Sequence, residues 1–442
     1  MSSNPGLQHP SQGTRPSRWF LSSLAALMVL LAISIAVAFL VTLRQSAQLR
    51  TGLIAGSSME PTLQGPKQQT TCPQCQRENI WTLDSWIPSR ELKCQFCDAF
   101  LDTNNTKTIP GKSIDYVPIL LVNKKGLLPQ GAPRSILPVQ RWELAVIRTP
   151  DDQLGQVKRV VGLPNEQVSI QSGRIYINGN PVLPSPTAFL RQAIVVAKWP
   201  PPPHLNQNKN TENNTENNNP PTQGDAFLKT IKYPLLNDLK TNAHDSHQLL
   251  PALDAGIALK LRTNEPSWNL HLTMLIDDQE IPIEISTYER TTSIHAGSRS
   301  VAVLPTNWNL EWLNFLVLGD TFVILDGKQE LGRMPLETFV ESHRRNSTPL
   351  NASRVRWTDL PTIDPNNLLQ QIILYRGRIY RGANDSDSQS FPASDGWIVL
   401  GDNVSISEDS RSFPTDQSRI LKQHLQGVVI EPESLMHNLL QQ

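Results

Sequence analysis

The chain has 442 residues, enough for two or three domains, and its 40 basic and 40 acidic residues give a formal net charge of zero. This charge balance gives no sign of a nucleic-acid-binding surface. The 35 prolines and the apolar fraction of 38% favour a loop-rich, mainly β protein over a helical bundle. All four cysteines lie between Cys72 and Cys97, which excludes a disulfide framework spread along the chain.

The N-terminal region contains one long apolar segment. Residues 1–18 are polar, whereas Trp19 to Leu43 include no charged residue. About 20 apolar residues suffice to span a bilayer, and the apolar region of a cleaved signal peptide is shorter, about 7–15 residues. We therefore predict a polar tail over 1–18 and a retained transmembrane helix over 19–43. Basic residues flank both ends of this segment, so charge does not decide its orientation.

A candidate nucleophile follows this segment, in the stretch Ala55–Leu63 (A-G-S-S-M-E-P-T-L). Small residues surround Ser58, and Pro61 stiffens the chain after it. A serine hydroxyl is a weak nucleophile until a neighbouring base removes its proton. No histidine lies in a recognisable triad pattern and there is no G-x-S-x-G motif. These absences direct attention to a lysine as the base.

The candidate base is Lys158, in the apolar segment Gln156–Pro164. Strand alternation places Lys158 and Val160 on one face, and Arg159 on the other, toward solvent or a structural partner. A lysine acts as a base only when neutral, and an apolar setting favours the neutral form by desolvation. The alternative is that this lysine belongs to an ordinary solvated strand face.

The third candidate stretch, Leu400–Arg411, is polar and follows an apolar strand. Asp409 and Arg411 are placed to pair and to fix the backbone, and Ser407 is placed to orient a lysine amine. Taken alone, this stretch is typical of a polar turn or a cation-binding loop.

The three segments S-M-x-P-T-L, K-R-V-V-G-L-P and G-D-N-x-x-x-S-x-D-S-R follow an N-terminal apolar segment in this order. Together they resemble the type I signal peptidases, membrane-bound serine proteases with a Ser–Lys dyad. The resemblance implies that Ser58 is the nucleophile, that Lys158 is the general base, and that catalysis needs no cofactor. It also implies that Ser407 holds the Lys158 amine and that Asp409 and Arg411 form a structural pair.

The resemblance also exposes a departure at the oxyanion site. The Ser58 backbone N–H would be one oxyanion donor. Some family members supply the second donor from a serine hydroxyl two residues before the nucleophile. Gly56 occupies that position here and offers no side-chain donor, so a main-chain or water donor is the alternative.

The cysteines form two C-x-x-C pairs, Cys72/Cys75 and Cys94/Cys97, separated by 18 residues. This spacing matches a four-thiolate zinc pattern. We therefore predict a zinc-ribbon-like insertion over 66–112 with a structural zinc. Four thiolates leave no open position for catalysis. Two disulfides are the alternative in an oxidising compartment.

Short strand-like segments with closely spaced turns favour a β-sandwich-like insertion over 251–386. Its segment Thr321–Lys328 resembles a strand and turn of laminin-G or concanavalin-like sandwiches. This insertion serves either carbohydrate or preprotein binding or, as we favour, structural elaboration. A low-complexity linker over 191–250 precedes it. An antiparallel β catalytic domain would then combine 44–65, 113–190 and 387–442.

The resemblance implies a single-pass membrane endopeptidase that removes signal peptides from secretory preproteins, with its catalytic domain on the extracytoplasmic side. Two other interpretations compete with it. One is a membrane-anchored binding or scaffold protein built on a decayed protease. The joint presence of five site residues argues against it: Ser58, Lys158, Ser407, Asp409 and Arg411. The other is a Ser–Lys self-processing protease, which has no need of the anchor.

Overall fold

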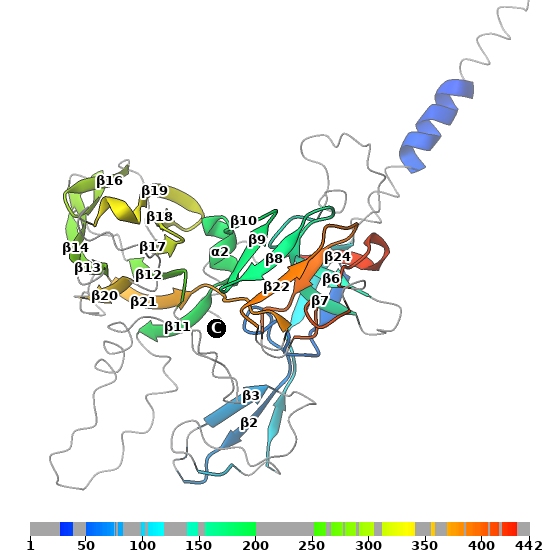
Figure 1. The fold of residues 1–442 in the computed structure, drawn as a ribbon, viewed down its shortest axis with the longest axis horizontal. Coiled ribbons are helices and arrows are strands. Elements are labelled where there is room, and N and C mark those ends of the chain that lie inside the picture. Colours follow the sequence, from blue (N-terminus) through cyan, green and yellow to red (C-terminus); the bar gives the residue numbers. More distant parts are fainter. Residues whose placement is uncertain are drawn as a thin grey trace, which may run out of the picture.

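The prediction of a mainly β protein is confirmed by the computed structural model, in which the strands of the described residues form five antiparallel sheets (Figure 1). No helix among the described residues is long and apolar enough to cross a membrane. Residues 27–38 form a helix with exposed side chains, and the rest of the predicted 19–43 helix lies outside the described residues. The structure describes residues 27–38, 50–74, 76, 78–82, 99–101, 105–118, 139–148, 155–199, 252–261, 267–276, 279–288, 291–304, 312–340, 355–358, 369–383, 386–404, 407–414 and 418–430.

Two sheets built from three separate chain segments form the part that carries the predicted site. The pair Asn178-Gly179, which follows the strand-like run Arg174–Ile177, predicts a hairpin turn, and this turn joins two of their strands. It is confirmed, because both residues have positive φ (51° and 83°), as a primed hairpin turn requires. The first sheet has the order β1 (Arg50–Leu53), β5 (Ser113–Pro118), β24 (Leu425–Val429), β6 (Leu144–Ile147), β7 (Gln156–Gly162) and β23 (Ile398–Leu400), and the second has the order β10 (Asn180–Pro181), β9 (Arg174–Ile177), β8 (Val168–Gln171) and β22 (Ser388–Phe391).

Strand β7 is covered on both faces, and this burial determines the environment of the site. Val161 packs with Ile170 in one apolar cluster, whereas Val160 packs with Ala145 in another. Alternate side chains of a strand point to opposite faces. Polar residues on this strand are therefore enclosed whichever way they point.

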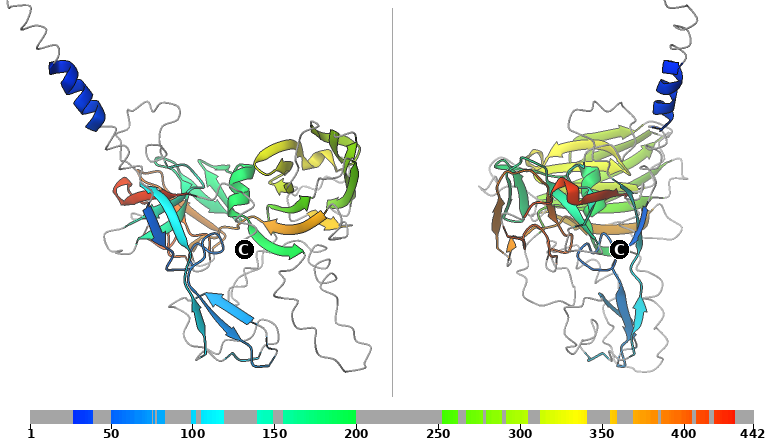
Figure 2. Two further views of the ribbon diagram at one scale, coloured as in Figure 1. Left: turned by 180° about the vertical axis from the view of Figure 1, so that it is seen from behind. Right: turned by 90° about the vertical axis from the view of Figure 1, so that its right-hand side faces the viewer.

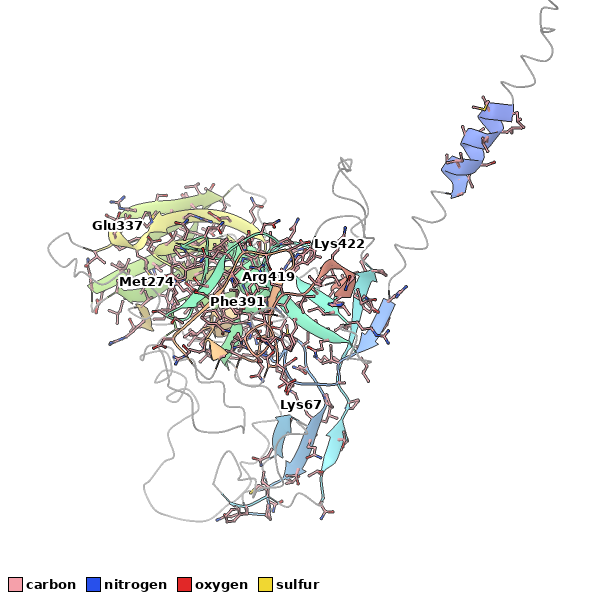
Figure 3. The ribbon with its side chains drawn as sticks, turned by 45° about the vertical axis from the view of Figure 1, so that its right-hand side comes forward. Lys67, Met274, Glu337, Phe391, Arg419 and Lys422 are labelled. Atoms are coloured by element: carbon pink, nitrogen blue, oxygen red, sulfur yellow. The ribbon has the colours of Figure 1, made fainter. Side chains whose placement is uncertain are left out.

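A small three-stranded sheet has the order β3 (Glu78–Thr82), β2 (Lys67–Thr71) and β4 (Lys107–Ile109). It extends away from the rest of the molecule in both views of Figure 2. Lys67 marks it in Figure 3, apart from Arg419 and Phe391 of the main sheets. The chain enters and leaves this small sheet at neighbouring positions. Ile54 N–H donates to the Lys112 carbonyl at 3.1 Å, and Lys112 N–H donates to the Gln64 carbonyl at 3.0 Å.

Two further sheets face each other across one apolar core, which contains Leu272, Ile283, Phe315 and Phe322. The buried positions alternate along the strands of the second sheet, as expected for strands with one covered face. The first sheet has the order β11 (Ile194–Trp199), β21 (Leu369–Arg376), β12 (Ala255–Leu261), β17 (Trp312–Leu318), β18 (Thr321–Asp326) and β19 (Gln329–Pro335), and the second has the order β16 (Arg299–Leu304), β15 (Thr291–Ala296), β14 (Gln279–Tyr288), β13 (Trp268–Ile276) and β20 (Val355–Thr358). We call this pair of sheets the two-sheet insertion.

Helix α2 (Pro186–Gln192) covers the outer face of the first of these sheets. It begins after Ser185, whose hydroxyl accepts the N–H of Ala188, and proline occupies the first helical position, where no N–H is needed. Phe189 of this helix packs against Tyr375 of β21. Figure 1 shows this helix between the two-sheet insertion and the sheets that carry the site.

The segment Ile194–Trp199 differs from the prediction, which placed it in the 191–250 linker. It forms strand β11, which pairs with β21. The sequence did not indicate this strand for two reasons. The proline and asparagine run that follows it gave the region its low-complexity character, and its partner strand lies far along the chain. The remainder of the predicted linker, 200–250, lies outside the described residues.

Candidate active site

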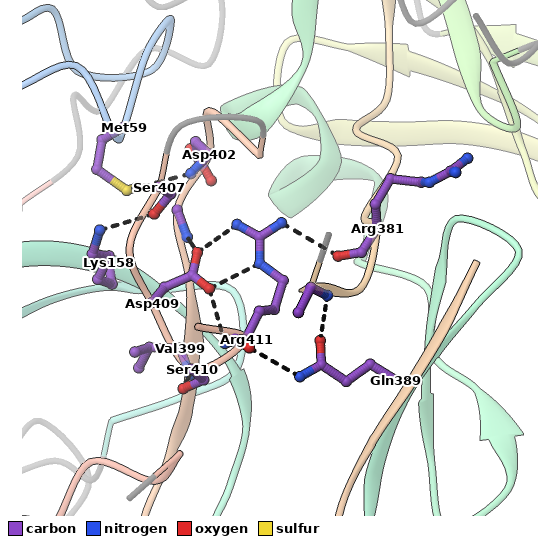
Figure 4. Close-up of polar contacts among 12 residues, drawn as sticks. Met59, Lys158, Arg381, Gln389, Val399, Asp402, Ser407, Asp409, Ser410 and Arg411 are labelled. Carbon is purple, nitrogen blue, oxygen red and sulfur yellow. Dashed lines mark hydrogen bonds and ion pairs between the residues drawn. The ribbon is translucent and has the colours of Figure 1, made fainter. Parts of the chain in front are cut away.

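The stretch around Ser58 follows β1 and forms tight backbone turns. Met59 anchors it, because its side chain is 2% exposed and packs with Leu144 and Val429. The Met59 sulfur also accepts a hydrogen bond from the Asp402 N–H at 3.5 Å (Figure 4). Ser58 itself is half-buried. The methionine thus holds the stretch in place while its neighbour remains partly accessible.

Lys158 lies on β7, and its side chain is enclosed, with 3% of the residue exposed. Its Nζ donates a hydrogen bond to Ser407 Oγ at 2.9 Å (Figure 4). The contact expected between this lysine and this serine is therefore present. Ser407 is itself buried on the loop that follows β23.

The loop after β23 also reaches the candidate nucleophile. Asn403 N–H donates to the Ser58 carbonyl at 2.9 Å, and its side-chain amide donates to the Ser57 carbonyl at 3.3 Å. A Cβ on Gly401 would overlap the Ser407 side chain and approach the Ser58 carbonyl oxygen to 2.7 Å. Only glycine fits there without displacing its neighbours. The structure therefore brings the three sequence segments together at Gly401.

Asp409 and Arg411 form the predicted pair. Arg411 donates from Nε and Nη2 to the two carboxylate oxygens at 2.8 and 2.6 Å, and Gly401 N–H donates to the same carboxylate at 2.7 Å. Burial alone would raise the pKa of Asp409, but the hydrogen bonds and charge of Arg411 hold it below its usual value. The ionised carboxylate thus ties Gly401 to the following turn.

A second buried ion pair was not predicted. Arg159 donates from Nε and Nη2 to Asp402 at 2.8 and 2.6 Å, and both side chains are completely buried. A third bond runs from Arg159 Nη1 to the Trp142 carbonyl at 2.6 Å. Strand alternation did not decide whether Arg159 faces solvent or a structural partner. The structure shows that it faces a structural partner, Asp402.

Two more groups converge on Asp402. Thr62 Oγ donates to its carboxylate at 2.5 Å, and Arg378 Nη1 donates to its carbonyl oxygen at 2.5 Å. Burial would raise the pKa of Asp402, but Arg159 and Arg378 lower it below its usual value. Thr62 and Asp402 lie inside the segments that carry the resemblance. Arg378 lies in none of them and gives no sequence signal of its position.

The remaining predicted site residues are only partly described. Gly56 is exposed, and a Cβ placed on it would have no atom within 4 Å. Cys72 is buried at the start of the loop between β2 and β3, whereas Cys75, Cys94 and Cys97 lie outside the described residues. Within the described ranges, no three potential metal-ligating side chains gather.

The comparison with protein families identifies the class of the chain. Residues 24–257, more than half of it, match the family model described as "Signal peptidase, peptidase S26". This match places the chain among the serine peptidases. It belongs to the signal peptidase S26 family, and this membership implies preprotein substrates.

The other comparisons add no functional information. No curated protein matches the chain. One matching solved structure is a putative β-glucanase from Mycobacterium abscessus, 13% identical, with a TM-score of 0.12. The match covers 30% of this chain and 55% of that structure's length. A similarity this low carries no argument about fold or function.

The burial of the Asp409–Arg411 pair predicts its contribution to stability. Replacing Asp409 by alanine would leave a buried guanidinium without its carboxylate, and this should lower the free energy of unfolding by about 3–5 kcal/mol. Urea unfolding of the full chain, followed by tryptophan fluorescence, measures the change.

The control is Glu330→Ala. Glu330 makes the same two-bond contact with Arg333 (2.9 and 2.8 Å), but on the surface, with the side chains 37% and 52% exposed. Its loss should cost no more than about 1 kcal/mol. Equal losses for the two variants would contradict the role of burial.

Proposed function

We propose that this protein is a membrane-anchored serine endopeptidase that removes N-terminal signal peptides from secretory preproteins through a Ser58–Lys158 dyad. One observation carries the proposal: the buried Lys158 amine lies 2.9 Å from Ser407, on the loop that also binds the Ser58 carbonyl. Membership of the signal peptidase family supports the same assignment.

In this mechanism Ser58 Oγ attacks the scissile carbonyl carbon while the neutral Lys158 amine takes the hydroxyl proton. The tetrahedral intermediate collapses, the C–N bond breaks, and Lys158 returns the proton to the leaving amine. Water, deprotonated by the same lysine, then attacks the ester carbonyl carbon. The bond between the acyl group and Ser58 Oγ breaks, the new carboxyl terminus leaves, and Lys158 returns the proton to Ser58. Desolvation favours the neutral amine that the first step requires, and Lys158 is almost fully enclosed.

The two ion pairs support this site without touching the substrate. Asp409 fixes Gly401 through its N–H, and Asp402 fixes the loop beside the Ser58 carbonyl. Such positioning matters, because a displacement of about 1 Å can reduce a rate by 10²-fold.

The anchor is part of the proposal. Residues 19–43 contain no charge, and the apolar side chains of the described helix 27–38 are exposed. A helix through the bilayer would hold the catalytic domain at the extracytoplasmic surface, where the carboxyl end of a signal sequence emerges. Substrate and nucleophile would then meet at high effective concentration.

The dyad predicts that Ser58→Ala and Lys158→Ala each abolish cleavage of a model preprotein while the chain remains folded. Cleavage is followed in detergent or vesicles by gel shift, and folding by circular dichroism. Ser412→Ala and Lys422→Ala, at exposed positions outside the site, should cleave like wild type. Wild-type activity in either dyad variant would exclude the mechanism. An intact mass shortened at a self-cleavage site would favour self-processing instead.

The open space at Gly56 predicts a gain of activity. A serine fits there without a clash and would place a hydroxyl two residues before the nucleophile. One oxyanion donor is worth about 10²–10³ in rate, so Gly56→Ser should raise kcat with little change in KM. Gly56→Ala, which adds only a methyl group, is the control. Equal rates in the two variants would show that the hydroxyl supplies no oxyanion donor.

We also propose that the four cysteines hold a structural zinc. Strands β2 and β3 form a hairpin whose loop begins at the buried Cys72, and Gln76 N–H closes a turn on the Cys72 carbonyl at 3.0 Å. Cys72 begins this turn, and the C-x-x-C spacing suits two thiolates bound to one metal.

Metal analysis of the purified full chain should find one zinc per molecule. After removal of zinc by a chelator, four thiols should react with a thiol reagent without prior reduction. Cys72→Ser should lose the metal. A metal-free protein whose thiols react only after reduction would instead indicate two disulfides.

A further inference from the structure

Arg378 connects the two-sheet insertion to the candidate active site. It follows the end of β21, the strand by which the chain returns from that insertion. Its Nη2 donates to Thr62 Oγ at 2.5 Å, and its Nη1 donates to the Asp402 carbonyl at 2.5 Å. The guanidinium thus joins the stretch that contains the nucleophile to the loop that holds Ser407.

Charge balance does not account for this arginine. Asp402 already receives two hydrogen bonds from Arg159, and a single guanidinium neutralises a single carboxylate. Arg378 adds a second cation, 3.3 Å from the same carboxylate and with its side chain 2% exposed. Burial lowers the pKa of Arg378, which reflects the unfavourable desolvation of its charge. A buried charge that is not needed for neutrality indicates another role.

That role follows from the geometry of Thr62. Thr62 accepts from Arg378 and donates to Asp402, so the three side chains form a closed triangle. Thr62 lies one turn after Ser58, in a segment with hydrogen bonds from Glu60 N–H to the Ser57 carbonyl and from Leu63 N–H to the Met59 carbonyl (both 3.0 Å). A shift of Thr62 would therefore be transmitted to Ser58.

The two-sheet insertion fixes the backbone next to Arg378. Gly377 N–H donates to the Asp254 carbonyl at 2.7 Å, directly before β12. The Asp254 carboxylate accepts from Gly319 N–H at 2.7 Å and pairs with Arg174 of β9 at 3.2 Å. Backbone contacts within the insertion, and its contact with the catalytic sheets, thus set the position of the residue preceding Arg378.

We propose that Arg378 is a positioning residue through which the two-sheet insertion sets the geometry of the Ser58 stretch. The inference rests on the proposed function and assigns to this insertion a role in catalysis besides any binding. Arg378 does not touch the substrate. It acts through Thr62 and Asp402.

The test compares steady-state cleavage of a model preprotein by the full-length wild type, Arg378→Gln, Thr62→Val and the double variant. We expect kcat to fall by about 10²-fold in Arg378→Gln, with KM changed by less than about 2-fold, because the nucleophile is displaced rather than the substrate contacts. Thr62→Val removes the contact with Arg378 with little change in side-chain volume, and its kcat should fall by a similar factor. The double variant should be no slower than the slower single variant.

Arg419→Gln is the matched control. Arg419 is as buried as Arg378, and its guanidinium donates to the backbone carbonyls of Pro392 and Gly396 rather than to Thr62 or Asp402. Its replacement should alter the melting temperature but not kcat. Arg378→Lys retains the charge but cannot reach both acceptors as a planar fork does, so its kcat should be intermediate.

Three results would overturn the inference: wild-type kcat in Thr62→Val, an equal loss of kcat in Arg419→Gln, or single-variant effects that multiply in the double variant. If Arg378→Gln does not fold, Thr62→Val and Arg378→Lys still decide the question. A wild-type chain that cleaves no preprotein would instead count against the proposed function.

Discussion

The carboxylate of Asp402 is the interaction on which the candidate site depends. It lies in a fully buried position where an isolated charge would be strongly unfavourable. Arg159 neutralises this charge, Thr62 donates a hydrogen bond to it, and Arg378 lies 3.3 Å from it; each of the three comes from a different part of the chain. Because an unpaired buried charge is so costly, these segments fold correctly only when they meet. The same requirement aligns Lys158, the neighbour of Arg159, with the loop that carries Ser407.

Gly401 adds a steric constraint to this electrostatic one. Its N–H is held by Asp409, and the space where a Cβ would stand is filled by the Ser407 side chain and the Ser58 carbonyl. The absence of a side chain therefore lets the loop approach both the candidate nucleophile and the orienting serine. Polar groups on three segments thereby become neighbours.

Local patterns predicted much of this arrangement. The mainly β architecture and the turn at Asn178 follow from residue types at short range, whereas the contact between Lys158 and Ser407 was expected from the resemblance to the signal peptidases. Arg378 and strand β11 were missed for one physical reason. Each is defined by a partner far along the chain, Thr62 for Arg378 and β21 for β11. An arginine or a short apolar run carries no local mark of such a partner, since tertiary packing alone selects it.

The pairing of β11 with β21 has an evolutionary consequence. The outgoing and returning strands of the two-sheet insertion are hydrogen-bonded neighbours, so the ends of the inserted segment are fixed close together whatever lies between them. Lengthening such a segment costs little loop-closure entropy. Whole modules can therefore be gained, lost or exchanged beyond the β11–β21 pair while the residues after β21 keep their place. The small three-stranded sheet, joined at adjacent backbone positions near Ile54 and Lys112, has the same tolerance, which makes this catalytic framework a suitable host for accessory domains.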